Sequence, residues 1–316
     1  MSQRRQHVVA IFAALAGLAL FVYAARRVGV AEILDGIHRV GWGLLVVLAL
    51  AGVRFLVRAE CWRWCLPPGT AFSLPRSLMA FLAGDAVGSV TPLGLLASEP
   101  TKILLTRHHL ATREAVSSLA IENLVYAASV VAMVGVGLVV VAATVPLPGA
   151  WLWAIGAALA ALCVGSLVVL RGVRGVWDVR RGTRPPWRER LAGVREEVLR
   201  FSGGHSSRVW RVFGLDLAFH ALAVLEVYLT LRWVFGDHSP TLVQAIAFEA
   251  LNRAVTVAFK FVPFRVGVDE ASAGALAAVL AIDPVAGVTL AVVRKVRNLF
   301  WAACGLALFA LHPSVE

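Results

Sequence analysis

Long, nearly uninterrupted stretches of apolar residues decide which folds are open to this chain. Eight such runs stand between polar segments, at residues 8–25, 42–57, 78–90, 119–145, 151–170, 212–234, 242–262 and 286–311. A helix that crosses the hydrocarbon core of a bilayer needs about 20 consecutive apolar residues, and it pairs its own backbone polar groups inside the lipid. The runs therefore predict an all-α, polytopic integral membrane protein with about seven or eight transmembrane helices.

Composition supports the same class. Mean hydropathy is +0.78 and only 16% of the residues are charged, whereas about 25% are charged in a typical soluble domain. We expect one membrane domain over residues 1–316, crossing the cell (inner) membrane several times. The first run, 8–25, is expected to be a retained helix rather than a signal peptide, because its core is long and no small-residue cleavage site follows it.

The positive charge is concentrated between residues 171 and 211, where eleven Arg stand against four acidic residues. Positive loops stay in the cytoplasm, so 171–211 is predicted to be a cytoplasmic basic loop, while 142–150 and 235–241, without Lys or Arg, fit the outside. A surface for anionic lipid headgroups is the second interpretation of the loop. Nucleic acid is not an expected partner, because no binding fold accompanies the charge.

Tryptophans near the ends of the runs, Trp62 and Trp210 among them, are expected in the headgroup layer of the membrane, which suits an aromatic ring with a polar edge. Arg54 and Arg58 are expected only to mark the end of a helix. Asp216 and His220 are one helical turn apart, which favours a local hydrogen bond between them.

Two apolar runs end in the same kind of break. Pro92 and Pro263 each follow an apolar run, a Gly comes shortly after, and Glu99 and Glu270 each stand seven residues after the proline. Irregular backbone at membrane depth survives only where protein buries it or where it lines a cavity. The pattern predicts two broken or re-entrant segments in functionally important places.

The two breaks also suggest an internal duplication. Their prolines, at positions 92 and 263, are 171 residues apart, and the same shift brings neighbouring apolar runs into register. We predict a first repeat-like half at 41–141 and a second at 212–311. Duplicated halves with broken helices in corresponding positions point to the central site of a transporter, whereas the alternative is a coincidence of two Pro-Gly loops.

Charged residues at bilayer depth are costly, so they face protein or a cavity and are candidates for function. Glu249, Asn252 and Arg253 are spaced to lie on one stripe of a helix. The predicted substrate-binding set shares this membrane setting: Glu99, Lys102, Glu249, Asn252, Arg253, Lys260, Arg265, Asp269, Glu270, Arg294, Arg297 and Asn298. Its mixed charge suits a phosphate and a second polar group, since Arg binds phosphate through a fork of hydrogen bonds.

These residues also have structural interpretations. Glu249 and Arg253 form an i,i+4 pair that can serve only as a bridge between packed helices, and Lys260 can extend to the membrane interface. The two glutamates after the prolines can cap loops, and the arginines of the last helix can be plain inside-positive residues.

Two segments of the chain resemble a known family. Residues 92–99 with Lys102 and 115–122 look like the first signature of the lysylphosphatidylglycerol synthase transmembrane (flippase-like) family. Residues 262–270, followed by the helix of Arg294, look like its second and more specific signature.

The resemblance covers roughly residues 42–311, with two departures. Ala97 and Ser98 stand where glycines usually precede the acid, and Asn123 stands where an Arg is usual. The family's synthases add a soluble aminoacyltransferase domain after the membrane part, and no such sequence follows within these 316 residues. The resemblance therefore implies lipid translocation or handling of lipid headgroups rather than synthesis.

The leading functional hypothesis is a flippase-like transporter that binds and moves a lipid with a polar, anionic headgroup. The alternatives are an accessory subunit that presents lipid to enzymes of lipid or glycan synthesis, and a membrane-embedded lipid-modifying enzyme. No catalytic residue is expected, because no Ser stands in a nucleophile motif and there is no phosphate-binding Gly loop. No cofactor or metal is expected either.

Overall fold

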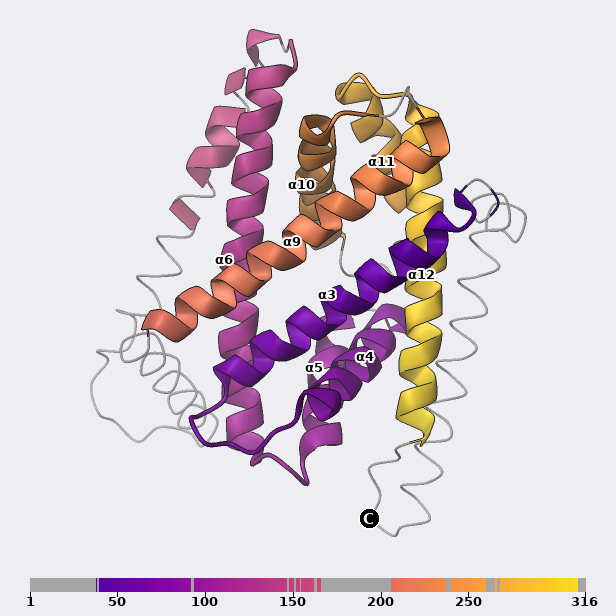
Figure 1. Ribbon diagram of the computed structural model, residues 1–316. Coiled ribbons are helices and arrows are strands. Elements are labelled where there is room, and N and C mark those ends of the chain that lie inside the picture. The colour runs from indigo at the N-terminus through magenta and orange to yellow at the C-terminus, as the bar shows by residue number, and fades with distance from the viewer. Residues whose placement is uncertain are drawn as a thin grey trace.

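The computed structural model describes residues 38–165 and 206–311, apart from 39, 92–93, 147, 151, 154, 162–163, 237–239, 260–264 and 266–267. The first apolar run, most of the basic loop, Lys260 and the two break prolines lie outside the described residues. All regular secondary structure in the described part is helical (Figure 1), which confirms the all-α prediction.

The helices have the following bounds: α3 (Gly43–Cys65), α4 (Leu74–Val90), α5 (Gly94–Thr106), α6 (Thr112–Thr144), α9 (Ser206–Phe235), α10 (Leu242–Ala258), α11 (Val268–Val279) and α12 (Pro284–Leu311). Two stretches are long and apolar enough to cross a membrane by themselves, Thr112–Thr144 and Ser207–Phe235. Helix α9 begins at Ser206, so the last residues of the expected loop are already helical. The total of seven or eight spans stays a prediction.

Local sequence explains where several helices begin. Thr241 and Gln244 form a capping box at α10, in which the Thr241 hydroxyl accepts from the Gln244 backbone at 3.3 Å and the Gln244 side chain accepts from the Thr241 backbone at 2.9 Å. Helix α12 begins at Pro284, whose fixed φ suits a first turn, and the Asp283 carboxylate accepts from the Val285 backbone at 2.9 Å.

The helices follow one another in two series of similar length. α3 to α6 have 23, 17, 13 and 33 residues, and α9 to α12 have 30, 17, 12 and 28 residues. Each series thus places two short helices between two long ones. The division into repeat-like halves stays a prediction.

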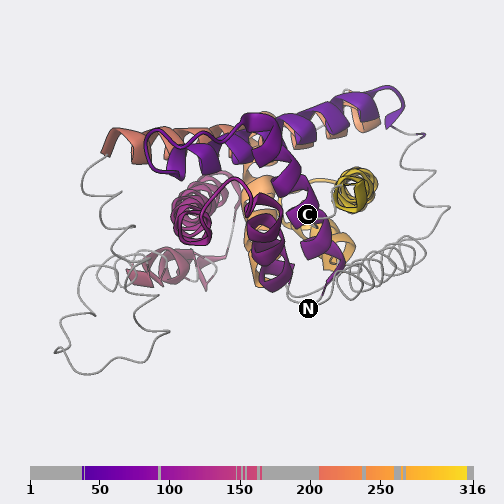
Figure 2. The ribbon, with the colours of Figure 1, turned by 90° about the horizontal axis from the view of Figure 1, so that it is seen from below.

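The two series are interleaved in space. Helices α3 and α9 lie side by side along one face and cross the other helices obliquely (Figures 1 and 2). Helix α4 packs on α12 of the other series, and α10 packs on α6. Small residues permit this approach, because a Cβ at Gly305 would lie 2.3 Å from the Leu82 carbonyl oxygen and one at Gly137 would lie 2.1 Å from the Ala250 Cβ.

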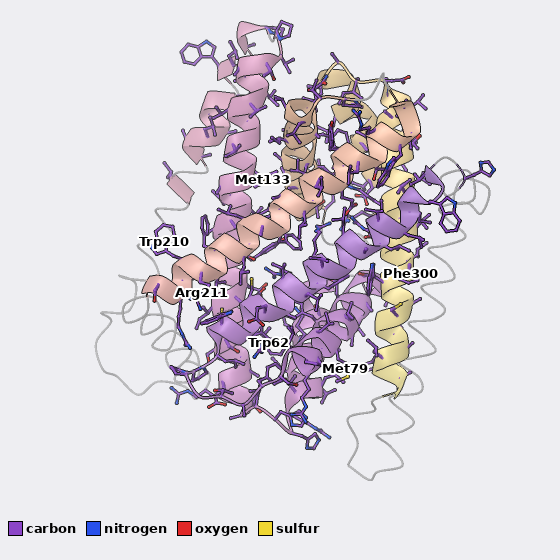
Figure 3. All side chains as sticks on the ribbon, in the orientation of Figure 1. Trp62, Met79, Met133, Trp210, Arg211 and Phe300 are labelled. Carbon is purple, nitrogen blue, oxygen red and sulfur yellow. The ribbon has the colours of Figure 1, made fainter. Side chains whose placement is uncertain are left out.

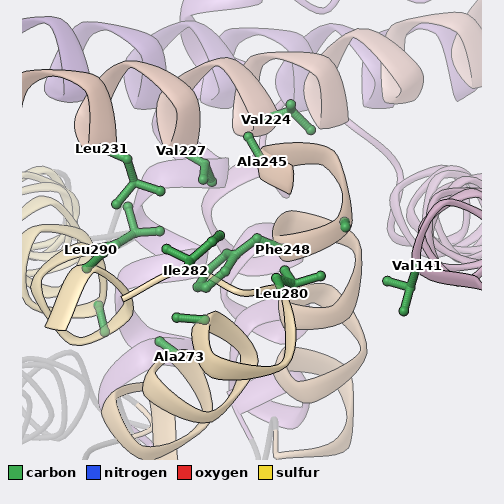
Figure 4. Close-up of a cluster of buried hydrophobic side chains, with 14 residues drawn as sticks. Val141, Val224, Val227, Leu231, Ala245, Phe248, Ala273, Leu280, Ile282 and Leu290 are labelled. Atoms are coloured by element: carbon green, nitrogen blue, oxygen red, sulfur yellow. The ribbon is translucent and has the colours of Figure 1, made fainter. Parts of the chain in front are cut away.

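A core of small and branched apolar side chains joins α9, α10, α11 and α12 (Figure 4). Val227 and Leu231 of α9 pack with Phe248 of α10 and Leu290 of α12 in this core, and all four are almost fully buried. The polar residues described next lie beside it, where α10 and α12 approach α3.

A second core surrounds Trp62, which is fully buried and donates its indole N–H to the Ser118 hydroxyl at 2.9 Å. Protein therefore encloses the indole of Trp62, and its place in the headgroup layer stays a prediction. Trp210 differs, because it is 70% exposed near the start of α9 (Figure 3). Large apolar side chains are exposed along α6 and α9, for example Val139 and Leu217, as expected for helices that face lipid.

Candidate functional site

A cavity of about 60 Å³ lies where α3, α10, α11 and α12 meet. Side chains that can hold an anion dominate its lining, which includes five arginines from three helices and one connection: Arg54, Arg253, Arg265, Arg294 and Arg297. We call this space the arginine cavity. Three helices and the connection between α10 and α11 thus place five guanidinium groups around one small volume.

Glu226 of α9 is the first anchor of these arginines. It is fully buried and accepts from Arg54 Nη1 at 3.1 Å. It also pairs with Arg297, and Arg294 Nε lies 3.7 Å from its Oε1. One carboxylate therefore orients three arginines, which is how a protein holds buried cations in place.

Glu249 of α10 is the second anchor. It is 1% exposed and pairs with Arg253 one turn further along the same helix, and with Arg294 of α12. Through Arg294 the pair also bridges two packed helices, as its structural interpretation expects. Arg294 lies between both carboxylates, so Glu226 and Glu249 form one network through it.

Arg265 completes the lining from the connection between α10 and α11. Its Nε lies 2.9 Å from the Asp269 carboxylate. Arg265 has a φ of 47°, a left-handed backbone that a side-chain-bearing residue adopts at a cost and that often marks a functional position.

The network leaves the cavity positively charged. Among the described residues, five arginines stand against the carboxylates of Glu226, Glu249 and Asp269, which leaves two of these positive charges unbalanced. Buried donors are also left over, because Nε of Arg54, Arg253 and Arg294 has no hydrogen-bond acceptor within the described part of the chain. Unpaired buried charge is costly, so the arrangement favours an anion or water in the cavity.

Most of the predicted site residues meet here. The cavity is lined by Glu249, Asn252, Arg253, Arg265, Asp269, Arg294, Arg297 and Asn298. Asn298 accepts from Arg297 Nη2 at 2.8 Å.

Three predicted residues lie elsewhere. Glu99 pairs with Lys102 at 2.9 Å, and Lys102 sits over the ring of Phe81, 4.0 Å from its centroid. Glu270 pairs with Lys295 of α12. None of the three predicted residues is among the described residues that line the cavity. Glu99 and Lys102 lie away from the cavity because their helix, α5, packs on α4. Lys260 lies outside the described residues.

Arg54 and Glu226 belong to the site although the sequence analysis did not include them. The prediction that Arg54 and Arg58 mark a helix end is wrong, because α3 continues to Cys65 and both arginines reach buried acids. Glu226 is an acid inside the apolar run 212–234. The rule that charge at membrane depth signals function would have found it.

A second buried ionic group lies one turn along α3 from Arg54. Arg58 Nη2 is 2.6 Å from Glu122 Oε1 of α6, and its Nη1 is 3.3 Å from Asp216 Oδ1 of α9. The predicted hydrogen bond between Asp216 and His220 is therefore wrong. Asp216 pairs with Arg58, and His220 Nε2 lies 3.0 Å from the Ser129 hydroxyl.

Comparison with known proteins places the chain in a family. No curated protein and no solved structure is significantly similar to the chain. The family model described as lysylphosphatidylglycerol synthase TM region matches residues 8–305, nearly the whole chain. This match confirms the resemblance seen in the two signatures. With its all-helical fold and its buried ionic site, the chain belongs to the lysylphosphatidylglycerol synthase TM region family of membrane proteins.

Proposed function

We propose that this protein is a flippase-like lipid transporter of the cell (inner) membrane, which binds a lipid by its anionic headgroup in the arginine cavity and moves it across the bilayer. The observation that supports this most directly is the meeting of five arginines in one cavity of an apolar helical bundle. Transport of this kind needs no covalent chemistry, so we propose a transporter rather than an enzyme.

The chemistry of the cavity suits a phosphate group. Two positive charges are unbalanced, and three guanidinium Nε donors have no acceptor in the described residues. Arginine presents its N–H groups in a planar fork that matches phosphate oxygens, and such charge-assisted bonds are stronger than neutral ones. An entering phosphate would relieve both the charge imbalance and the missing acceptors.

A lipid fits the surroundings better than a free ion. The family model describes the membrane region of a lipid synthase, and large apolar side chains are exposed along α6 and α9. Helices α5 and α11 have 13 and 12 residues, which makes them about 20 Å and 18 Å long, whereas a hydrocarbon core is about 30 Å thick. We propose that they are the two broken segments and do not cross the bilayer alone.

A second candidate function is an accessory subunit that presents lipid to an enzyme of lipid or glycan synthesis. One sequence observation favours it, namely that the chain has no phosphate-binding Gly loop for a nucleotide. Such a subunit would bind lipid in the same cavity without moving it. Lipid that copurifies with the protein, identified by mass spectrometry, together with a negative transport assay would support this candidate.

Arg294→Ala tests the transporter. Purified protein is reconstituted into vesicles that contain a fluorescent acidic phospholipid, and movement is followed by quenching the outer leaflet. Loss of a hydrogen-bonding charge costs about 1.5–3 kcal/mol, so we expect the rate to fall about tenfold or more. The matched control is Arg232→Ala, because Arg232 is exposed in α9 and its loss should leave the rate unchanged.

Equal rates in the wild type and in Arg294→Ala would contradict the assignment of the cavity. Arg294→Lys adds a second comparison, because Lys keeps the charge but loses the fork of donors. We expect its rate to lie between those of the wild type and Arg294→Ala. Each variant is first shown to be monodisperse and helical, so that loss of folding is not mistaken for loss of transport.

A further inference from the structure

Two carboxylates share one cation beside the arginine cavity. Glu122 Oε1 of α6 lies 2.6 Å from Arg58 Nη2, and Asp216 Oδ1 of α9 lies 3.3 Å from Arg58 Nη1. The three side chains come from three different helices, so tertiary packing alone brings them together. The group has one positive charge against two carboxylates.

Burial makes this imbalance costly. Glu122 and Asp216 are both 0% exposed. Their other oxygens, Oε2 of Glu122 and Oδ2 of Asp216, have no hydrogen-bond donor among the described residues. An ionised carboxylate without full pairing is strongly disfavoured in such a place, and two carboxylates that compete for one cation favour the neutral form of one of them.

The neighbouring ionisable groups do not supply the missing positive charge. Those that face the pair or its arginine are Cys61 and Cys65 of α3, Glu99 and Lys102 of α5, Tyr126 of α6 and His220 of α9. Lys102 is already paired with Glu99. His220 bonds Ser129 and stacks on Tyr126. Cys61 Sγ lies 3.7 Å from Asp216 and is a weak neutral donor.

We propose that Glu122 and Asp216 hold one exchangeable proton between them, so that the Arg58 group is a proton-binding site. With one carboxyl neutral, the remaining carboxylate and Arg58 form a balanced pair. Two such acids titrate as a unit, and the proton belongs to the pair rather than to one residue. The two oxygens without donors are the atoms where the proton would sit.

The proposed proton site touches the arginine cavity through two routes. Arg58 and Arg54 are one turn apart on α3, and Arg54 lines the cavity. The ring of Tyr126 lies under Arg58, 3.8 Å from centroid to guanidinium carbon, and its hydroxyl accepts from Arg253 Nη1 at 3.5 Å. Uptake of a proton would make the region more positive and so strengthen anion binding. Only this link between proton uptake and anion binding rests on the proposed function. Through it, a proton gradient would drive lipid movement.

Infrared difference spectroscopy tests the proton site without reference to transport. The full chain in lipid nanodiscs is titrated from mildly acidic to alkaline pH, and the carbonyl stretch of a protonated carboxylic acid is measured. We expect this band in the wild type, its decrease as the pH rises, and its loss in Glu122→Gln or Asp216→Asn. Loss in only one variant would also support the site and would assign the proton to that residue.

Glu60→Gln is the control, because the side chain of Glu60 is 30% exposed and pairs with Arg63 outside both sites, and this variant should keep the band. Absence of the band in the wild type, or its persistence in both Glu122→Gln and Asp216→Asn, would overturn the proposal. If one variant fails to fold, the other still tests the assignment, and absence of the band in the wild type overturns the proposal without either variant.

A second measurement separates the proton site from the lipid function. In sealed vesicles, a gradient of one pH unit should change the ratio of labelled lipid between the leaflets about tenfold if one proton moves with each lipid. Glu122→Gln should lose this response. If the wild type moves no lipid but shows the band, only the proposed function fails. If it moves lipid without the band, only the proton site fails.

Discussion

At the scale of residues, Glu226 and Glu249 hold the guanidinium groups of the arginine cavity in position. Each carboxylate holds more than one guanidinium, and Arg294 contacts both. Because the acids are fully or almost fully buried, the arginines are fixed in position before any ligand arrives, and preorganised donors bind an anion at a lower cost. The acids are therefore positioning groups and also compete with the ligand.

Glu226→Gln should destabilise the protein, because it leaves Arg54 and Arg297 without their counter-charge. Removing one partner of a buried ion pair costs about 3–5 kcal/mol, and we expect a decrease of this size in the free energy of unfolding, measured by circular dichroism in detergent micelles. Inorganic phosphate should restore part of the lost stability by occupying the vacated place.

Glu60→Gln is the matched control. Glu60 pairs with Arg63 at 2.5 Å, but both side chains are about one-third exposed, at 30% and 34%. A pair of this kind contributes about 0–1 kcal/mol, so Glu60→Gln should change the free energy of unfolding by no more than that. If Glu60→Gln and Glu226→Gln have equal effects, Glu226 does not anchor the arginines.

At the scale of elements, glycines set how closely helices of the two series can approach. Gly305 of α12 faces the backbone of α4, and Gly137 of α6 faces Ala250 of α10. These contacts join the first series to the second, and they hold α10 and α12 where their arginines meet the same cavity. Their effect on the site is through helix position rather than through chemistry.

Gly305→Ala should loosen the contact between α4 and α12. Its Cβ would lie 2.3 Å from the Leu82 carbonyl oxygen, so one helix must move, and overpacking of this kind costs about 1–3 kcal/mol. The free energy of unfolding in micelles measures this loss. Gly214→Ala is the control in α9, where a Cβ meets nothing within 4 Å, and better helix propensity should raise stability by up to about 1 kcal/mol. Equal stability of the two variants would show that Gly305 does not limit the approach.

At the scale of the whole molecule, the orientation of the helices in the membrane is a prediction from the charge of their connections. Helix α6 ends at the top of the view in Figure 1, whereas α9 begins at the left, beside the middle part of α6. The end of α6 and the start of α9 therefore lie at different levels of the bundle. The distribution of arginine predicts the cytoplasm for residues 171–211 and the outside for residues 142–150.

Cysteine labelling in intact cells tests this orientation. In a variant without the native cysteines, a cysteine in place of Ser206 should react with an impermeant reagent only after the membrane is permeabilised, because arginine-rich segments stay in the cytoplasm. Gly149→Cys is the counterpart, since Gly149 is exposed beyond the end of α6, and it should react from outside. Labelling of position 206 from outside would reverse the topology.

Much of this protein follows from its sequence alone. The lengths of the apolar runs determined that the chain is a helical membrane protein, because lipid has no hydrogen-bond partners for backbone N–H and C=O groups and a helix pairs these groups internally. The two signatures identified the family, and charge within apolar runs pointed to the second-half residues that line the cavity, such as Arg253 and Arg294.

Only the tertiary structure decided which charges meet. Spacing along a helix predicts contacts one turn apart, such as Glu249 with Arg253, but it contains no information on which face of α3 turns toward α9 or α12. Packing of those helices brought Arg54 to Glu226 and Arg58 to Glu122 and Asp216, and it placed Glu99 and Lys102 outside the arginine cavity. Burial of charge requires a partner, and the identity of that partner is set by how the helices pack.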